Sequence, residues 1–551
     1  MNTLIINANI YTMNPQQPQA KAMLIENGVI KKLWNKGGTD EIIVEAGSDT
    51  PVIDAKGQLM LPGFIDTHNH LIMYAQNKNE ANCSASNCES IQDIQQKLIE
   101  QKRMTSPSDW VIGWGYDDTL LKENRHPVRE ELDDVIPHQP AIIKHISGHF
   151  MVANTKALEA AGITETEEDP QGGHFGRYSN GILNGILHEV GAIQRLVAYL
   201  PEKSEDILLE ELKAGAKDYI REGITTSTEA AVGIFSAKKE LPLLVQALEE
   251  GHLPFDLRLM IMEDALQFEG KDYKDDVKAL DQLLKNKSNG RMGIDSVKFF
   301  QDGSIQLRTA ALSDPYIGTT EHGMLVFEQE DFNKKVRKYH DQKVRVSSHG
   351  NGDQAIHSIL EAYKKAQDEN PHPHANHRVE HAQTIQDIDL ELAAAYNFPL
   401  SFFINHIYYW GDRHRDIFLG KQRAEQMNPL RKAEKFGILF TLHSDCPITP
   451  ISPLFSIWAA CCRQTRNGDV LGENQCLSVE KAVETMTIDG ARLNGEENMK
   501  GSLAPGKIAD FITLDKNIFE ADPMQIRDAS VTATWKNGQL IYEKEKTFET
   551  L

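Results

Sequence analysis

Cysteine is scarce in this chain, with 6 residues among 551. So few cysteines exclude a disulfide scaffold for a protein of this size, and none of them forms Cys-x-x-Cys. Cys461 and Cys462 are neighbours, which suits a buried helix. We therefore predict reduced thiols and a cytoplasmic protein.

Long hydrophobic runs and an excess of positive charge are also missing. No apolar run approaches the ~20 residues that a membrane-spanning helix needs. The first residues lack the basic and apolar regions of a signal peptide. The formal net charge of −22 would repel nucleic acid phosphates and anionic membrane surfaces. We therefore expect a small-molecule substrate, no nucleic acid partner and no membrane partner.

Both ends of the chain contain short strand-like patterns. Asn27-Gly28 and Asn537-Gly538 each lie between such patterns, and Asn-Gly is a strong hairpin signal. We predict that residues 1–60 and 500–551 pair into one small β-sandwich domain. The expected strands of these two segments are 3–10, 21–26, 29–34, 41–45, 506–514 and 529–542.

The middle of the chain, residues 61–499, alternates β-branched runs with helical segments, which is the pattern of βα units around a parallel sheet. Eight parallel strands with intervening helices are the number that closes a barrel. We therefore predict an α/β fold, a (β/α)8 TIM-type barrel. Its eight strand-like runs are 61–70, 223–231, 256–263, 296–302, 344–349, 377–383, 399–405 and 438–445.

A long segment separates the first strand-like run from the second. It contains about 150 residues, far more than a βα connection needs. We predict that residues 75–215 are a large insertion that forms a lid subdomain over the barrel mouth, with one strand at 141–150.

Polar residues lie where several predicted barrel strands end, and barrel enzymes place their active sites at this edge. Histidine and carboxylate side chains are ligands for zinc or a similar divalent ion. Singly, each histidine is best explained as a hydrogen-bonded core or surface residue. Together they predict a metal site. The residues at these strand ends are His68, His70, His349, His381 and Asp445.

Lys298 lies inside the fourth predicted strand and has two interpretations. A lysine can extend its charged end outward to solvent. Alternatively, a buried neutral amine captures carbon dioxide and becomes a carbamate anion that bridges two metal ions. Val297, Phe299 and Phe300 flank the lysine and favour a buried strand. Without the carbamate, a site with one metal ion is still workable.

Several motifs resemble those of the amidohydrolase superfamily, in the branch of the N-substituted formamide deformylases. They cover nearly the whole chain and include a glycine-rich piece of the insertion, 113–117. The resemblance implies hydrolysis of an amide or similar bond, with His68, His70, Lys298, His349, His381 and Asp445 as metal ligands. The matching motifs are 61–70, 297–304, 349–353, 380–383, 443–445 and 501–511.

Asp445 is the candidate catalytic residue. A carboxylate at the end of the last strand can bind a metal ion and also accept the proton of an attacking water as a general base. The alternative is a helix N-cap before Pro447. His443 faces the same side one layer deeper, and Asp66 is expected to support His68 from below.

Four further residues are candidate substrate contacts. Tyr116 and His149 lie in the insertion. Glu229 ends the second strand, and could instead support the ligands or replace Lys298 as a ligand. Arg308 could pair with a substrate carboxylate or with Asp302.

The function remains open between related alternatives. The same ligands suit hydrolysis of esters, cyclic ureas or aminated heterocycles. A catalytically inactive barrel that acts as an interaction protein is expected to lose ligands, and this chain keeps them. We predict one or two divalent ions, zinc being favoured, and leave a homodimer open.

Overall fold

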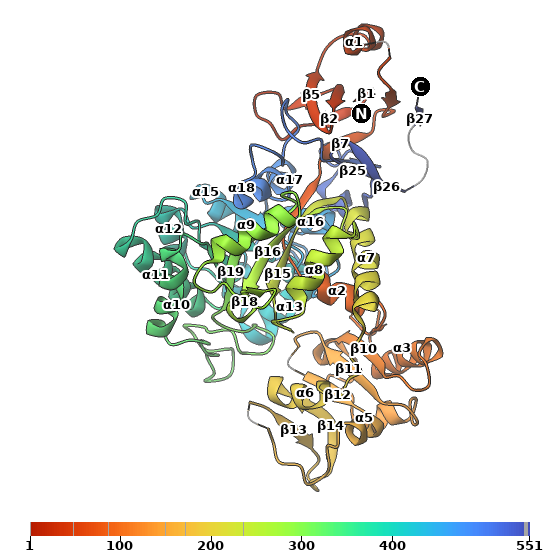
Figure 1. Ribbon diagram of the computed structural model, residues 1–551. Coiled ribbons are helices and arrows are strands. Elements are labelled where there is room, and N and C mark those ends of the chain that lie inside the picture. The colour runs from red at the N-terminus through yellow and green to blue at the C-terminus, as the bar shows by residue number, and fades with distance from the viewer. Residues whose placement is uncertain are drawn as a thin grey trace. The chain divides into compact units, whose positions relative to one another are not determined.

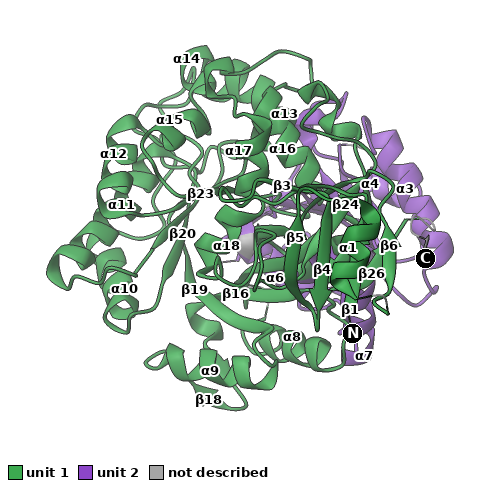
Figure 2. Ribbon diagram, turned by 90° about the horizontal axis from the view of Figure 1, so that it is seen from above, with its two compact units in different colours: residues 1–71, 216–551 green, residues 72–215 purple. Residues whose placement is uncertain are grey.

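The computed structural model describes residues 2–47, 49–85, 87–148, 150–170, 172–234, 236–544 and 549–550. The chain folds into two compact units (Figure 2). The first unit contains residues 1–71 and 216–551, and the second contains residues 72–215. The domain boundaries that the sequence suggests stay a prediction.

An eight-stranded parallel sheet forms the centre of the first unit (Figure 1). Each predicted barrel run overlaps one of its strands, which confirms an α/β fold with a nearly closed barrel of eight parallel strands. In the order of their pairing the strands are β8 (Phe64–Asn69), β15 (Ile224–Val232), β16 (Asp256–Met262), β19 (Met292–Phe300), β20 (Val346–Gly350), β21 (Arg378–His381), β22 (Leu400–Phe402) and β23 (Phe440–Leu442).

The first and last strands of this sheet approach each other and nearly close the barrel. Asp445 donates its backbone N–H to the carbonyl of His68 at 3.3 Å. The hydroxyl groups of Thr67 and Thr441 lie 2.8 Å apart, and Ser444 donates a hydrogen bond to Asp66 at 2.9 Å. These contacts bring together the two ends of the barrel sequence.

Helices follow the barrel strands and surround the sheet. In α11 the buried residues Ile356, Ile359, Leu360 and Tyr363 recur at helical spacing, which gives the helix one apolar face. The helices of this unit are α8 (Glu240–Glu249), α9 (Val277–Lys287), α10 (Gln329–Asp341), α11 (Asp353–Glu369), α12 (Asp387–Tyr396), α13 (His406–Arg413), α14 (Lys421–Glu425), α15 (Leu430–Lys435), α16 (Pro453–Cys462), α17 (Val479–Thr485) and α18 (Ile488–Asn494). Two helices, α2 (Leu71–Asn77) and α7 (Glu205–Arg221), contain the points where the chain passes from one unit to the other.

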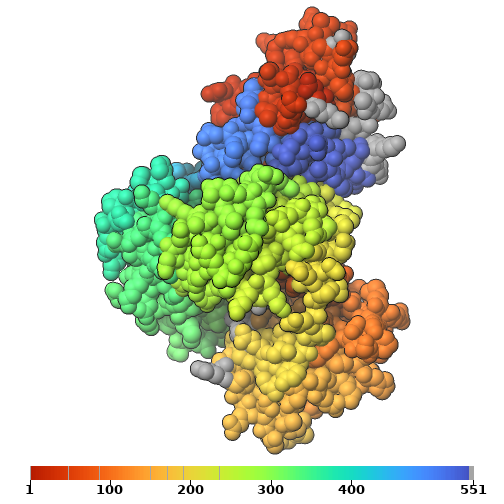
Figure 3. Space-filling model, viewed as in Figure 1, coloured from red at the N-terminus to blue at the C-terminus, as the bar shows by residue number. Residues whose placement is uncertain are grey.

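Strands from both ends of the chain share one six-stranded sheet, and the red and blue segments lie against each other in Figure 3. Its order is β26 (Gln539–Glu543), β25 (Val531–Lys536), β24 (Phe511–Leu514), β7 (Leu59–Pro62), β2 (Asn9–Tyr11) and β3 (Gln19–Ala20). A five-stranded sheet contains β27 (Glu549–Thr550), β6 (Val52–Asp54), β1 (Asn2–Ile6), β4 (Ala22–Glu26) and β5 (Val29–Trp34). Met23 and Ile30 share a hydrophobic cluster with Phe511 and Trp535, so residues of both sheets form one core.

Both predicted hairpins are present. Strands β4 and β5 pair antiparallel across Asn27 and Gly28, and β25 and β26 pair across Asn537 and Gly538. All four turn residues have positive φ angles, between 51° and 81°. Asn and Gly tolerate this conformation best, which explains why this dipeptide identified the turns.

The predicted strand at 41–45 is wrong, because these residues belong to helix α1 (Thr39–Ala46). Glu41 accepts a hydrogen bond from the backbone N–H of Gly38 at 3.3 Å, which satisfies a free donor at the helix start. Asp40 and Glu41 also place negative charge in the first turn, where the helix dipole favours it. The three β-branched residues that follow, Ile42 to Val44, therefore do not decide the local structure.

The second unit contains a six-stranded sheet of its own. Its order is β13 (His174–Arg177), β14 (Leu183–His188), β12 (Phe150–Ala153), β11 (Ala141–His145), β10 (Val111–Tyr116) and β9 (Ala81–Asn82). Its helices are α3 (Ile91–Met104), α4 (Arg129–Asp133), α5 (Thr155–Ala160) and α6 (Glu189–Val197). The strand predicted at 141–150 is thus two antiparallel strands, β11 and β12, separated by a turn. The predicted lid role of this segment stays a prediction.

A buried ionic cluster joins the start of β16 to the sheet made from the chain ends. Asp256 accepts hydrogen bonds from Lys500 and, at 2.8 Å, from Lys536, and Lys536 also contacts Asp510 at 2.6 Å. Lys500, Lys536 and Asp256 are all less than 9% exposed. Removing one partner from such a cluster leaves buried charge without compensation.

We expect Asp256→Asn to destabilise the protein by about 3–5 kcal/mol, because two buried ammonium groups lose their shared carboxylate. The measurement is the shift of the urea or thermal unfolding midpoint. Asp331→Asn is the matched control, since Asp331 pairs with Lys334 on the surface with 64% of its side chain exposed. Its midpoint should barely move, and an equal midpoint for both variants would contradict the prediction.

Candidate metal centre

Three predicted ligands converge at one edge of the barrel. The Nε2 atoms of His68 and His70 lie 3.4 Å and 3.3 Å from Oδ1 of Asp445. One donor atom from each of these residues lies within 4.8 Å of the others. His68 and His70 thus share one face at the end of β8, as the alternation of strand side chains predicts. This spacing suits three ligands around one cation.

The backbone around Asp445 directs its side chain toward the two histidines. Asp445 follows β23 and has a φ angle of 52°, a left-handed conformation that is uncommon for residues other than glycine and asparagine. Below it, Asp66 accepts hydrogen bonds from the backbone N–H of His68 at 3.1 Å and from the Ser444 hydroxyl at 2.9 Å. Asp66 therefore holds the ends of β8 and β23 together, which agrees with the supporting role that we expected for it.

The proton arrangement of His68 tests whether these residues fit a cation. Nδ1 of His68 lies 2.7 Å from Oε2 of Glu380, and an ionised carboxylate can only accept a hydrogen bond. The proton therefore belongs on Nδ1, and the lone pair of Nε2 faces Oδ1 of Asp445. Two electron-pair donors at 3.4 Å repel each other unless a cation lies between them. The residues fit a metal ion.

His349 and His381 lie beside this group. The ring centroids of His68 and His381 are 4.9 Å apart, and those of His349 and His381 are 4.5 Å apart. His349 Nε2 lies 2.9 Å from the Gly303 carbonyl and 3.1 Å from the side-chain nitrogen of Asn351. The donor atoms of His349 and His381, both of them described residues, do not join the group of three.

His443 supports His381 from below. Nε2 of His443 lies 3.2 Å from Nδ1 of His381, and Nδ1 of His443 lies 2.8 Å from the Ser401 hydroxyl. When His381 donates from Nδ1, its Nε2 is free to bind a metal ion, and His443 can pass the hydrogen bond on to Ser401. This agrees with the deeper position predicted for His443.

Lys298 is buried, with 1% of its surface exposed. Its Nζ atom makes no hydrogen bond to any described residue and lies 5.2 Å from the centre of the Phe300 ring. Burial lowers the pKa of Lys298 to about 8, although the charges of Glu380 and Asp445 act in the opposite direction. The interpretation of a lysine that extends to solvent is therefore wrong.

The electrostatics keep the imidazoles of His68 and His349 neutral near pH 7. Burial, with Lys298 nearby, lowers the pKa of His68 to about 4 and that of His349 to about 3. Burial acts to raise the pKa of Asp445, but the hydrogen bond with His70 holds it below its usual value. Neutral imidazole and ionised carboxylate are the forms that bind divalent ions.

Solvent reaches this edge of the barrel at three side chains. His70, Asp445 and His349 expose 12%, 11% and 14% of their side chains, whereas His68 exposes 2%. A small molecule can therefore approach Asp445 from the side of His70 and His349, while His68 lies behind them.

Glu229 lies near the site but has a backbone partner. Its Oε2 accepts a hydrogen bond from the N–H of Leu71 at 2.5 Å, at the first residue of α2. Leu71 directly follows His70, so Glu229 anchors the chain where His70 leaves the strand. Its proposed contact with substrate stays a prediction.

Tyr116 is the candidate contact of the second unit that the structure describes. Tyr116 is fully buried in that unit, and its hydroxyl lies 3.0 Å from Nδ1 of His126. His145 pairs with Asp118 at 3.1 Å, and donor atoms of Asp117, Asp118 and His145 lie within 4.8 Å of one another. His149 lies outside the described residues. The substrate roles of Tyr116 and His149 stay predictions.

Arg308 does not pair with Asp302, so that alternative is wrong. Arg308 instead lies 3.5 Å from Glu321 on the surface. Asp302 is buried and accepts backbone N–H groups of Ala311, Asn351 and Gly352 at 2.7–3.0 Å. Backbone donors of the surrounding chain thus occupy the carboxylate of Asp302. A contact between Arg308 and substrate stays a prediction.

The sequence prediction overlooked the role of Glu380, although Arg378 and Glu380 are charged residues inside a run assigned to a buried strand. That conflict was the available signal.

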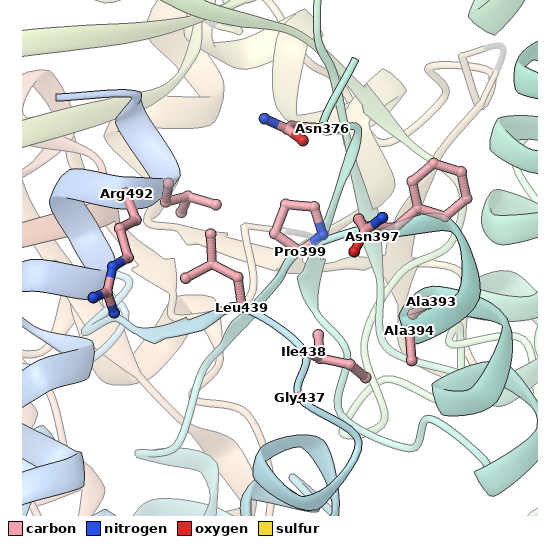
Figure 4. A pocket seen from close by; sticks show the side chains of 11 residues that line it. Asn376, Ala393, Ala394, Asn397, Pro399, Gly437, Ile438, Leu439 and Arg492 are labelled. Atoms are coloured by element: carbon pink, nitrogen blue, oxygen red, sulfur yellow. The ribbon is translucent and has the colours of Figure 1, made fainter. Parts of the chain in front are cut away.

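A hollow at the other end of the barrel holds no comparable group: Pro399, Leu439 and Arg492 line it, where β22 and β23 begin (Figure 4). No helix among the described residues is long and apolar enough to span a membrane.

Comparisons with known proteins agree along the whole chain. A model described as the amidohydrolase family matches residues 51–542. The putative amidohydrolase YtcJ of Bacillus subtilis strain 168 is 30% identical over 548 residues, which cover 97% of this chain and 98% of the relative. An N-substituted formamide deformylase of Arthrobacter pascens is 28% identical over 562 residues, which cover 98% of each chain.

A solved structure shares the fold. The crystal structure of an uncharacterized metal-dependent hydrolase from Pyrococcus horikoshii OT3 superposes with a TM-score of 0.74 and 23% identity. The superposition covers 95% of this chain and 99% of that one.

Proposed function

Because this chain belongs to the amidohydrolase family, we propose that it hydrolyses an amide-type carbon–nitrogen bond of a small molecule at a divalent metal centre. His68, His70 and Asp445 would hold the metal, with His349, His381 and Lys298 completing the ligand set. The observation that carries the proposal is the approach of His68 Nε2 and His70 Nε2 to Oδ1 of Asp445, at 3.4 Å and 3.3 Å.

The metal ion, when bound, supplies Lewis acidity that polarises a carbonyl group and makes water a stronger acid. Asp445 is the general base: its carboxylate takes a proton from the attacking water and returns it to the leaving amine. His68 stays neutral, and His68 and His70 fix the position of Asp445. Zinc fits the imidazole and carboxylate donors well, and manganese and iron share this preference in part.

Lys298 would contribute as a carbamate. Its amine adds to carbon dioxide and releases one proton, which gives an anionic oxygen ligand in place of a buried cation. The burial of Nζ and its lack of a hydrogen-bond partner among the described residues support this step. An uncharged amine is the reactive form, and burial favours it.

N-substituted formamides are the substrates we would test first. The similarity to the deformylase of Arthrobacter pascens extends over 98% of both chains, which supports the choice at 28% identity. The acyl group of a formamide is also the smallest possible, which suits a site where even the most exposed ligands, His70, Asp445 and His349, expose only 11–14% of their side chains.

The test combines metal analysis with a substrate panel. We expect purified protein to contain zinc, manganese or iron, and to release amine from an N-substituted formamide but not from a peptide. Chelation should abolish turnover, and the same metal should restore it. Ester, cyclic urea and aminated heterocycle substrates form the comparison set. Absence of bound metal together with absence of turnover on every substrate would contradict the proposal.

A further inference from the structure

We propose that Glu380 positions His68 for metal binding, and that a chain of alternating charges inside the barrel holds Glu380 in place. The inference rests on the proposed metal centre and deepens it, because it names a residue that acts through a ligand. Glu380 lies on β21, and His68 lies on β8. These strands are not neighbours in the sheet, so the contact crosses the barrel interior.

The contact itself is short, and both side chains are buried. Oε2 of Glu380 lies 2.7 Å from Nδ1 of His68, and the side chains are 0% and 2% exposed. A histidine ring with its proton on Nε2 would place two acceptors against each other at this distance. Glu380 therefore selects the ring form whose Nε2 lone pair points toward Asp445 and His70.

Glu380 is itself fixed by an arginine. Nε of Arg378 donates to Oε1 of Glu380, and both side chains are completely buried. Arg378 and Glu380 are two residues apart on β21, so they share one face of the strand. The two oxygens of the carboxylate thus have separate partners, which leaves the group no freedom to rotate away from His68.

The chain of charges continues through the neighbouring strands. Arg378 also contacts Asp295 at 3.2 Å, and Asp295 accepts a hydrogen bond from Arg345 at 2.6 Å. From Glu380 to Arg345 the charges alternate in sign and sum to zero. No member exposes more than 13% of its side chain.

A backbone irregularity gives Asp295 this position. In the pairing of β16 with β19, Leu259 pairs with Ile294 and Met260 with Ser296, so Asp295 is an extra residue. Such a bulge redirects the side chain of the inserted residue. The strand that carries Lys298 is thus also shaped to hold the support of Glu380.

A buried ionic chain can also be purely structural, and stability alone would not separate the two roles. The test therefore measures metal affinity in the folded, full-length protein. Metal is removed by dialysis against a chelator, and Zn²⁺ is titrated back against a chromophoric competitor. The absorption spectrum of the Co²⁺-loaded protein reports the geometry of the ligands independently of activity.

We expect Glu380→Gln to bind Zn²⁺ about 10–100-fold more weakly than the wild type and to change the Co²⁺ spectrum. Glu496→Gln is the matched control, because Glu496 forms another buried pair with an arginine, Arg258, at exposures of 6% and 11%. The control should keep the wild-type affinity and spectrum even if its unfolding midpoint falls.

Glu380→Asp covers the case in which Glu380→Gln does not fold. It keeps the charge beside Arg378 but shortens the reach toward His68 by one methylene group, so Zn²⁺ affinity should still fall. Wild-type affinity and an unchanged spectrum in the folded Glu380 variants would overturn the inference and leave the proposed function intact. A wild-type protein that binds no Zn²⁺ or Co²⁺ would overturn both.

Discussion

Replacing Asp445 by asparagine is expected to lower kcat by about 10²–10⁴-fold, the range that a general acid–base residue contributes. The amide keeps the size and shape of the side chain and still offers Oδ1 to a metal ion, but it has no basic oxygen for a proton. The histidines beside it are unchanged, so much of the metal should stay bound. The measurements are kcat on the best formamide substrate and metal content after gel filtration.

Asp331→Asn is the control for this variant, because it makes the same chemical change at an exposed side chain. It should keep wild-type turnover. Near-wild-type activity of Asp445→Asn with metal bound would remove Asp445 from the catalytic role. Loss of activity together with loss of all metal would instead identify Asp445 as a ligand only.

The second large effect concerns Lys298. We expect Lys298→Met to lower kcat by two or more orders of magnitude, on the order of several kcal/mol of lost transition-state stabilisation. Methionine fills a similar buried volume but cannot capture carbon dioxide. The metal content per chain should fall in parallel, because an anionic ligand is missing.

A direct readout of the carbamate separates it from an unmodified lysine. Wild-type protein exchanged into ¹³C-bicarbonate should show one carbamate carbon resonance that is absent from Lys298→Met. Lys500→Met is the control, since Lys500 is also buried, at 3% exposed, but lies beside Asp256. That control should keep the resonance and the metal content. Wild-type protein without the resonance would support an unmodified lysine.

The parts of the fold that depend on short-range sequence patterns were predictable. The eight barrel strands follow from runs of β-branched residues, and the hairpins at Asn27-Gly28 and Asn537-Gly538 follow from the positive φ angles that these residues tolerate. The error at 41–45 has the opposite cause. There, acidic residues at a helix start outweighed three β-branched residues in a row, Ile42 to Val44.

The candidate site also has one part that the sequence pattern predicts and another part that it does not. His68 and His70 share a face because strand side chains alternate, and Asp445 was placed with them because parallel strands end at one edge. The alternative in which Arg308 pairs with Asp302 was wrong, since the surrounding loop supplies three backbone N–H groups to Asp302 and Arg308 lies beside Glu321. Such loop geometry has no periodic signal in the sequence.

The sequence by itself determined the architecture of the barrel and the residues that meet at its carboxyl edge, because strand periodicity and strand order act locally. Only the tertiary structure decided which atoms face each other. The contact of Glu380 with His68 joins strands 312 residues apart along the chain and crosses the barrel interior. The bulge at Asp295 and the left-handed backbone at Asp445 depend on neighbouring strands. These features determine the direction of the His68 lone pair, on which the proposed metal centre depends.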